Sequence, residues 1–412
     1  MNVLHLCTFD TGGAGIAARR LCEAQQSAGI SARLLHLHPN RTANGQPFYA
    51  PPTGFARYSQ RFLEAGQALG LPFKAPHQRL HHLRNKPAGY ELFSTPFSAH
   101  RPENTAWLKQ ADVVHLHWIS GLVHHPSFFK ALRGKRVVWT LHDQAPFTGG
   151  CHYALDCHGF ENECARCPQL GNPADAAPFF RIKRESLSGI KNLHVITPSN
   201  WIRRASERST LFGSYTHHTL ANPVSGDVFR PLHRAACRSA LGLPQDQFLA
   251  LFVSLDLTNP RKGGAIIQEA ATYFANHAAI RLVGLGKSDG DAPYLHLGTI
   301  RDERLMAMVY SACDVVLFPS FADNLPNVVS EAHRCGTPVL AFRLGGLPEM
   351  IEHGKNGWLT QPNPGEFCSA LERIASEPAL DREAIAAGAD AAYSPTLLLP
   401  QFSNIYDIAQ PC

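Results

Sequence analysis

The chain has 412 residues, of which 44% are hydrophobic and 17% are charged. This composition describes a globular protein and excludes a disordered one, and the length predicts two domains of roughly 150–200 residues. The formal net charge of +5 is too small to indicate nucleic-acid binding, although it suits anionic small molecules or an anionic membrane surface. No apolar run approaches the roughly 18–20 residues that span a bilayer, and the start of the chain has no basic region. We therefore expect a cytoplasmic protein without a signal peptide.

Short apolar runs alternate with helical patterns along the chain, which is typical of βαβ units and parallel sheets. In the first half, the expected strands are residues 3–7, 32–37, 113–117, 137–141 and 194–197. In the second half, they are residues 249–254, 280–283, 294–297, 315–318 and 339–342. We predict an α/β fold with two Rossmann-like domains, at residues 1–215 and 216–390. An irregular crossing is expected at 217–234, and the last segment, 391–412, should pack its helix back on the first domain.

A glycine-rich loop with Gly12, Gly13 and Gly15 follows the first expected strand and precedes a helix expected to start near Ile16. Glycines let backbone N–H groups approach an anion at a helix N-terminus. The spacing is not Gly-x-Gly-x-x-Gly, and the second strand ends in 36–39, His-Leu-His-Pro, without an acid to bind a ribose. The pattern therefore argues against NAD.

Basic and apolar residues interleave between Phe55 and Lys86. Six cations stand there against the single acid Glu64: Arg57, Arg61, Lys74, Arg79, Arg84 and Lys86. One interpretation is an ordinary solvated surface. The other is an amphipathic patch that contacts anionic lipid.

Histidines occur at the ends of two expected strands of the first half. His115 and His117 are two residues apart on one strand, so both side chains should point to the same face. A two-histidine metal site is one hypothesis, and a contact of His117 with an acceptor substrate is the favoured one. His142 directly follows strand 137–141, where a structural polar residue and a catalytic residue are the alternatives.

Four of the 11 cysteines are crowded into one segment: Cys151, Cys157, Cys164 and Cys167. The last two form a Cys-x-x-Cys pair, a spacing typical of metal knuckles, and a reducing compartment disfavours disulfides. We predict a structural zinc site. Unligated thiols and redox chemistry are the alternatives.

Arg261 and Lys262 follow strand 249–254 and precede two glycines at a predicted helix start. Adjacent cations at this place form a candidate clamp for a diphosphate leaving group, because negative charge develops on it. An exposed basic turn is the alternative.

Two carboxylates mark the region after strand 315–318. Asp323 and Asn324 lie on the expected loop, and Glu331 lies on a helix predicted to begin near Asn327. Ligands of open α/β sheets bind outside the carboxyl ends of the strands. The acids are therefore candidate site residues, although their spacing alone equally describes an acidic loop and a solvated helix glutamate.

The segment from Ser320 to Val339 resembles the signature of the retaining GT-B glycosyltransferases of family 4. In that signature, two acids separated by seven residues precede Ala, a small residue, Gly and Pro-Val. The matching positions here are Asp323, Glu331, Ala332, Cys335, Gly336, Pro338 and Val339. The first acid is Asp instead of Glu. The family's Arg, five positions before Lys262, is replaced by Leu257, so Lys262 carries over directly and Arg261 only by its chemistry.

The resemblance implies a retaining, metal-independent transfer from a UDP-, GDP- or ADP-sugar, with no catalytic cofactor. Lys262 and Arg261 would neutralise the diphosphate, and Glu331 would bind the ribose. Asp323 and Asn324 would bind the sugar hydroxyls.

On the first domain, His142 matches a family histidine that lies beside the transferring sugar. The loop Gly12–Gly15 matches a loop near the donor phosphates and the acceptor.

The segment from Leu141 to Pro168 resembles enzymes of bacterial exopolysaccharide assembly, including the colanic-acid type. This implies a glycan or lipid-linked acceptor met at the inner face of the membrane, and no nucleic acid partner. A nucleotide-sugar epimerase or phosphorylase of the same fold and a non-catalytic partner in polysaccharide assembly are the alternatives.

Overall fold

The computed structural model describes residues 1–37, 92–256, 259–287 and 293–409. The basic segment Phe55–Lys86 and Leu257 lie outside these residues. The chain divides into two compact units. Unit 1 comprises Met1–Pro198, Ile202–Leu220 and Leu399–Cys412, and unit 2 comprises Ser199–Trp201 and Ala221–Leu398.

Unit 1 is built on a six-stranded parallel sheet with the order β2-β1-β3-β4-β5-β6. Its strands are β1 (Asn2–Leu6), β2 (Ser31–Leu35), β3 (Val113–Leu116), β4 (Arg136–Thr140), β5 (Leu193–Thr197) and β6 (Thr216–Thr219). In the register, Leu6 of β1 pairs with Leu35 of β2 and with Leu116 of β3.

The helices of the first half lie between these strands, and the C-terminal helix returns to unit 1. They are α1 (Gly12–Ser27), α3 (Ala106–Gln110), α4 (His125–Ala131), α5 (Ala176–Leu187), α6 (Asn200–Arg208) and α14 (Pro395–Ile408). Short 3-10 turns are η2 (Pro102–Asn104), η3 (Ala145–Phe147), η4 (Gly159–Glu161) and η5 (Pro173–Asp175). Phe402 and Tyr406 of α14 lie against His115 of β3, with ring centroids 6.1 and 5.6 Å away.

Unit 2 also has a six-stranded parallel sheet, with the order β12-β11-β10-β7-β8-β9. Its strands are β7 (Phe248–Asp256), β8 (Ile280–Lys287), β9 (Leu295–His296), β10 (Val315–Phe318), β11 (Val339–Phe342) and β12 (Gly357–Thr360). Its helices are α7 (Arg234–Leu241), α8 (Gly264–Tyr273), α9 (Glu303–Ala312), α10 (Asn327–Arg334), α11 (Leu347–Met350), α12 (Pro364–Ser376) and α13 (Arg382–Tyr393).

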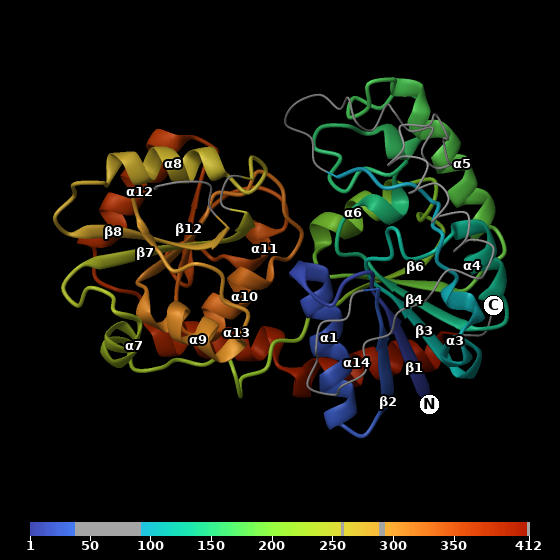
Figure 1. Ribbon diagram of the computed structural model, residues 1–412, viewed down its shortest axis with the longest axis horizontal. Helices are drawn as coiled ribbons and strands as arrows, with labels where there is room; N and C mark the ends of the chain where they lie inside the picture. The colour runs from blue at the N-terminus through green and yellow to red at the C-terminus, as the bar shows by residue number, and fades with distance from the viewer. Residues whose placement is uncertain (38–91, 257–258, 288–292, 410–412) are drawn as a thin grey trace, which may run out of the picture. The chain divides into compact units, whose positions relative to one another are not determined.

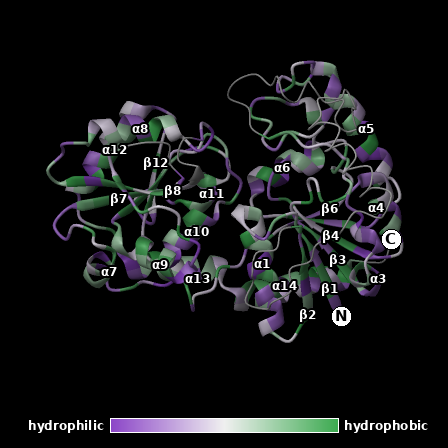
Figure 2. Ribbon diagram, in the orientation of Figure 1, coloured by the Kyte–Doolittle hydropathy of each residue, from purple (hydrophilic) through white to green (hydrophobic). Residues whose placement is uncertain are grey.

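The strands of unit 2 are apolar on both faces, because helices cover both sides of the sheet. Leu249 and Leu251 of β7 pack with α9, α10 and α13, whereas Ala250 and Phe252 pack with α8 and α12 (Figure 1). Hydrophobic colour accordingly follows the strands of both sheets (Figure 2). Successive side chains of a strand point to opposite faces of the sheet. Because both faces are buried here, successive positions of the strand are apolar, which gives the continuous apolar runs of the sequence. The predicted α/β fold with two parallel sheets is confirmed.

Two details of the predicted elements are wrong. Helix α1 begins at Gly12 and not near Ile16, so the expected glycine loop forms the first helical turn. A Cβ on Gly15 would lie 2.5 Å from the carbonyl oxygen of Phe9, so the turn needs glycine for close packing. The expected irregular crossing at 217–234 begins inside β6, an edge strand whose polar residues lack the apolar pattern of a buried strand.

Within the described part of the chain, no helix combines the length and the apolarity that crossing a bilayer requires.

Candidate active site

The strand order of unit 2 has a reversal point between β7 and β10. From there the chain adds β8 and β9 on one side and β11 and β12 on the other. Ligands of open α/β sheets bind at such a point, outside the carboxyl ends of the strands. Arg261 and Lys262 follow β7, and Asp323 follows β10. The fold therefore brings the predicted cations and the predicted acid to one edge of the sheet.

The two cations converge on the carboxylate of Asp323. Lys262 Nζ forms an ion pair with Asp323 Oδ2, and Arg261 Nη1 lies 3.4 Å from the same oxygen. Arg261 also donates to the carbonyl oxygen of Ala322 at 2.5 Å, and Ser320 Oγ donates to Asp323 Oδ2 at 3.2 Å. The Lys262 ammonium lies over the ring of Phe318, 5.2 Å from its centroid. These contacts hold both cations at the end of β10.

The charge of the cluster follows from its burial. Burial alone would raise the pKa of Asp323, but the nearby Lys262 and Arg261 outweigh it and hold that pKa below its ordinary value. Asp323 is therefore ionised at neutral pH although only 6% of it is exposed. Two cations and one anion leave a net positive charge, which suits a phosphate-bearing ligand.

Glycines allow the loops of this site to approach one another. Gly263 has φ +78°, and a Cβ there would lie 2.2 Å from the carbonyl oxygen of Pro319. A Cβ on Gly346, which follows β11, would lie 1.7 Å from the carbonyl oxygen of Asn324. The loops after β7, β10 and β11 are thus packed backbone to backbone. Sequence reasoning missed Gly346, and the only signal was another Gly-Gly pair after a strand.

Glu331 lies on α10 and is buried, with 6% of its surface exposed. Its Oε2 accepts a hydrogen bond from the hydroxyl of Tyr310 on α9 at 2.8 Å. Sequence reasoning missed Tyr310, because a tyrosine in an apolar helical pattern looks like any core aromatic. Asn324 Oδ1 accepts a hydrogen bond from Ser199 Oγ at 2.6 Å, so the predicted sugar-binding amide is also oriented.

In unit 1, three predicted groups follow adjacent strands. The glycine turn of α1 follows β1, His117 follows β3, and His142 follows β4. Both histidines line a cavity of about 20 Å³, together with Trp118 and Asp143. The cavity lies within unit 1 at the carboxyl ends of β3 and β4.

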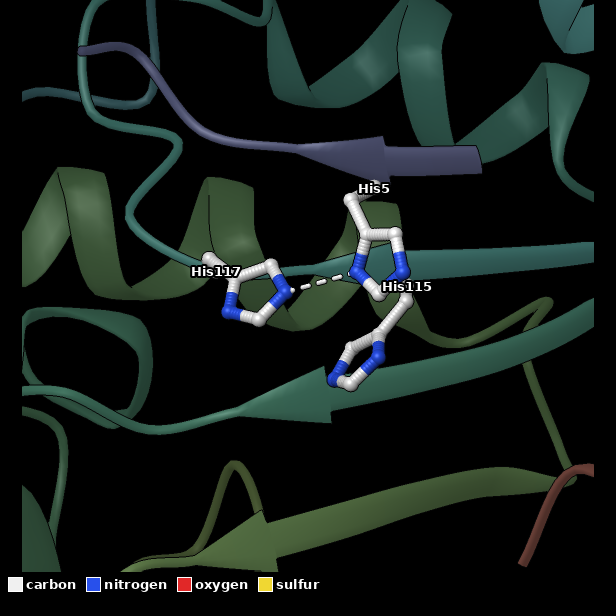
Figure 3. Close-up of side chains that lie close together, drawn as sticks. All are labelled: His5, His115 and His117. Carbon is white, nitrogen blue, oxygen red and sulfur yellow. Dashed lines mark hydrogen bonds between the residues drawn. The ribbon is translucent and has the colours of Figure 1, made fainter. Parts of the chain in front are cut away.

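A chain of hydrogen bonds runs from this cavity into the core of unit 1. His142 Nε2 lies 2.9 Å from His117 Nδ1, and His117 Nε2 lies 3.0 Å from His5 Nδ1. His5 Nε2 lies 2.8 Å from Gln25 Oε1. Figure 3 shows His5 of β1 and His117 facing each other, with His115 of β3 beside them. His115 and His117 stack at 4.3 Å, which confirms that both point to one face of the sheet.

The same histidines bear on the hypothesis of a histidine metal site. Among the described residues, His5, His115 and His117 are the one group whose candidate ligand atoms all lie within 4.8 Å of one another. However, all six of their ring nitrogens are in hydrogen bonds, those of His115 with the Tyr406 hydroxyl at 2.8 Å and Thr140 Oγ1 at 2.7 Å. A metal ion would have to break this network. The geometry therefore favours a polar network over a metal centre.

Burial keeps these histidines neutral. It lowers the pKa of His5 and His142 to about 4, and it lowers the pKa of His115 and His117 well below the ordinary value. These four histidines are thus uncharged at neutral pH.

The four clustered cysteines lie elsewhere in unit 1. They all line a cavity of about 10 Å³, and none forms a disulfide: Cys151, Cys157, Cys164 and Cys167.

Comparison with known proteins places Arg261, Lys262, Asp323 and Glu331 within a family match. Residues 250–377 match the family model described as "Glycosyl transferases group 1". A curated relative, D-inositol 3-phosphate glycosyltransferase 2 of Catenulispora acidiphila, is 29% identical over 205 residues, which are 44% of this chain and 48% of the relative. The chain thus covers about half the length of this curated relative.

Two solved structures resemble the whole chain. Sucrose-phosphate synthase from Thermosynechococcus elongatus superposes with a TM-score of 0.64 and 18% identity, covering 99% of this chain and 98% of that one. Anabaena HepE in complex with UDP-glucose gives a TM-score of 0.64 and 17% identity, covering 99% of both chains. At this identity, the likeness shows the fold. Residues 250–377 therefore match a glycosyl transferases group 1 domain, in a chain with the two-domain α/β fold of these solved structures.

Proposed function

We propose that the chain is a retaining glycosyltransferase that uses a nucleotide diphosphate sugar. The observation that carries the proposal is the pair of cations, Arg261 and Lys262, held on Asp323 at the reversal point of the unit 2 sheet. The family match spans both cations, Asp323 and Glu331. The complex of HepE with UDP-glucose supports a nucleotide sugar as donor.

In this proposal, Lys262 and Arg261 bind the diphosphate. Before the donor binds, the carboxylate of Asp323 holds both cations in position. When the phosphate oxygens bind, the cations would exchange part of their contact with Asp323 for the diphosphate. Asp323 and Asn324 then bind the sugar hydroxyls, and Glu331, held by Tyr310, accepts hydrogen bonds from the ribose. No metal ion is needed to bridge the diphosphate, because the two side chains supply its countercharge.

The transfer itself breaks the bond between the anomeric carbon and the phosphate oxygen, and the nucleotide diphosphate leaves with the electron pair. The acceptor hydroxyl attacks the same face, and its proton passes to the leaving phosphate. Electrostatic stabilisation of that leaving group is then the main catalytic effect. We assign His142 to the transferring sugar, His117 to the acceptor, and the turn of Gly12, Gly13 and Gly15 to the donor phosphates.

For the acceptor, we propose a glycan or lipid-linked glycan of a bacterial surface polysaccharide. The support is the resemblance of the segment Leu141–Pro168 to enzymes of exopolysaccharide assembly. An enzyme of this kind would meet its acceptor at a membrane surface, and the basic segment Phe55–Lys86 is the proposed contact. Each Lys or Arg near an anionic surface contributes about 1 kcal/mol, an attraction that salt screens.

The donor is identified by thermal shift with a panel of UDP-, GDP- and ADP-sugars, because a ligand of the native state raises the unfolding temperature. The sugar that binds is then tested for release of free nucleotide with and without a glycan acceptor, and with EDTA or added Mg²⁺. Release that depends on the acceptor and not on the metal supports the proposal. An epimerised donor without an acceptor, or binding without turnover on every acceptor, would reject it in favour of an epimerase or a non-catalytic partner.

The membrane contact has a separate test. Flotation with anionic and neutral vesicles at low and high salt compares the wild type with a variant in which Arg57, Arg61, Lys74 and Arg79 are changed to Ser. Recovery only on anionic vesicles at low salt, lost in the variant, is expected. Equal recovery on both vesicle types would leave the segment as a solvated surface.

A further inference from the structure

We propose that Cys151, Cys157, Cys164 and Cys167 bind a structural zinc ion. The proposal does not depend on the glycosyltransferase function. All four side chains line one cavity of about 10 Å³, which is close to the space that a single water-sized sphere occupies. The fold thus gathers four thiols that are spread over 17 residues of sequence around one small cavity.

Two backbone N–H groups around the cavity donate to cysteine sulfurs. The N–H of Gly149 donates to Cys164 Sγ at 3.2 Å, and the N–H of Gly159 donates to Cys157 Sγ at 3.4 Å. Such donors stabilise sulfur that carries negative charge, as hydrogen bonds to metal ligands generally do. Cys164 adopts φ 50°, a left-handed conformation that is uncommon for a residue with a side chain.

One cation lines the cavity and another lies near its cysteines. Lys183 is buried, and its ammonium donates to the carbonyl oxygens of Ala145 at 2.6 Å and Thr148 at 3.0 Å, beside Cys151 and Cys164. Arg166 lines the same cavity. Four thiolates around one Zn²⁺ carry a net charge of −2, and a buried ammonium beside them would compensate part of it.

The spacing of the four sulfurs is wider than that of zinc ligands. Among the described residues, only the three histidines form a group of candidate ligand atoms within 4.8 Å of one another. Zn–S bonds of about 2.3 Å would set the sulfurs roughly 3.8 Å apart in a closed tetrahedron. Binding therefore requires the loop segments to move inward, so the ion should stabilise this part of unit 1.

The test uses the full chain purified without chelator. Elemental analysis should give about one zinc per chain, and cobalt substitution should give the absorption of a tetrahedral thiolate site. Cys157→Ser, at the least buried of the four positions, should lose the metal. Cys22→Ala, which removes a buried thiol of unit 1 outside the cluster, should keep it.

Folded wild-type protein that contains no zinc after growth and refolding with zinc would overturn the proposal. So would equal zinc content in Cys157→Ser and Cys22→Ala, or two disulfides among the four cysteines. Thiol titration before and after unfolding provides a measurement that does not depend on how well the variants fold.

A second inference comes from the histidine chain. We propose that Gln25 and Tyr406 are positioning residues that set the tautomer of His142; the kinetic part of this inference rests on the proposed function. The amide oxygen of Gln25 faces His5, so His5 Nε2 carries the proton and His5 Nδ1 accepts. His117 Nε2 must then donate to His5, and His142 Nε2 must donate to His117 Nδ1.

This leaves Nδ1 of His142 as an unprotonated acceptor nitrogen. The direction of the whole chain depends on one amide, because turning Gln25 over would reverse every donor and acceptor along it. The amide is held by Tyr406, whose hydroxyl accepts from Gln25 Nε2 at 2.8 Å and lies 2.8 Å from His115 Nδ1. Helix α14 therefore reaches His142 through Tyr406, Gln25, His5 and His117. The first three of these side chains do not have to touch substrate.

Tyr406→Phe and Gln25→Leu keep the approximate shape of the core and remove one link each. Histidine ¹⁵N NMR at pH 7 should show His142 mainly protonated on Nε2 in the wild type and a mixture of tautomers in both variants. In turnover, we expect kcat to fall about 3- to 10-fold with the donor KM unchanged, as for an interaction made only in the transition state. Tyr393→Phe, at a buried tyrosine that is not part of the hydrogen-bond chain, is the matched control.

Unchanged tautomers in Tyr406→Phe and Gln25→Leu, or kinetics equal to those of Tyr393→Phe, would overturn the inference. Absence of any transferase activity in the wild type would reject the proposed function instead, and the NMR measurement would still decide the tautomer chain.

Discussion

The two units place their polar groups at the same location of two similar sheets, but charged side chains meet in one location and neutral histidines in the other. In unit 2, Lys262, Arg261 and Asp323 form a charged cluster after β7 and β10. In unit 1, His117 and His142 form a neutral network after β3 and β4. The parallel sheet fixes where side chains meet, and the residue types at the strand ends decide what they bind.

Burial explains how both arrangements are stable. A buried charge is costly unless a partner compensates it, and Asp323 has two cations for that purpose. The histidines avoid the cost by remaining neutral and by sharing hydrogen bonds with one another. A charged site can neutralise a leaving diphosphate, whereas a neutral one can orient hydroxyl groups. Loss of a charge should therefore cost more activity than loss of a histidine.

Lys262→Ala should give the largest effect. In the proposed function Lys262 opposes the charge of the leaving group, so its removal should lower kcat/KM by roughly 100-fold or more, as removal of one electrostatic donor does in other enzymes. Arg261→Ala should cost less, because Arg261 lies farther from Asp323 and also supports the Ala322 carbonyl. Nucleotide release at saturating acceptor measures both, with Lys355→Ala, an exposed lysine, as the control.

If Arg261→Ala is the more damaging change, the diphosphate is bound mainly by Arg261. Arg261 would then replace the family arginine whose position Leu257 occupies in this chain.

Glu331→Gln should lower kcat/KM by more than tenfold, about 1.4 kcal/mol or more, because a neutral amide accepts weaker hydrogen bonds from hydroxyls than a carboxylate. Tyr310→Phe should cost less, since it removes only the bond that orients Oε2. Tyr273→Phe, at an exposed tyrosine of unit 2, is the control. Wild-type kinetics in Glu331→Gln would reject the assignment of Glu331 to the ribose.

His142→Ala should lower kcat by about tenfold and leave the thermal shift by the free nucleotide diphosphate unchanged, because the proposed role of His142 is at the transferring sugar and not at the nucleotide. His158→Ala, at an exposed histidine of unit 1, should change neither quantity. Loss of donor binding in His142→Ala would show that the neutral site of unit 1 contributes to donor affinity, and the contrast between the units would fail.

The sequence predicted most of the fold because the buried parallel strands are continuous apolar runs. The strands missed, β6 (Thr216–Thr219) and β12 (Gly357–Thr360), are short or polar and carry no such signal. The sequence indicated the candidate groups Lys262 and Asp323 because they follow strands, and Glu331 because of its spacing from Asp323. Tyr310, the partner of Glu331, and His5, the partner of His117, were missed, since one looks like a core aromatic and the other is a histidine in an apolar strand. Pairings between residues 20 to 381 positions apart are set by packing, which the sequence pattern does not reveal.

The two units should also differ in how their stability depends on pH. This difference has the smallest effect at neutral pH and appears in acid. The folded-state pKa of His5 and His142 is about 4, below the ordinary value of 6.5. Above pH 6.5 these groups are neutral in both states, so they cost nothing. As the pH falls from 6.5 towards 4, these histidines bind protons in the unfolded state but not in the folded state. The free energy of unfolding therefore decreases by about 1.4 kcal/mol per pH unit for each histidine.

Unit 1 has four such histidines in its network, including His115 and His117, whereas in the described part of unit 2 only His333 has a pKa lowered to about 4. Asp323 acts in a lower pH range: its pKa is depressed, so its contribution to stability is present above the ordinary carboxyl pKa and is lost only below it.

Hydrogen exchange at pH 7, 6 and 5 should therefore show β1 and β3 opening before β7 and β10. His5→Gln should reduce the dependence of the unfolding free energy on pH between 6.5 and 5 by about one proton, whatever its effect on stability at pH 7. Unit 2 opening first, or an unchanged slope in His5→Gln, would mean that the histidines of unit 1 are not held neutral by burial.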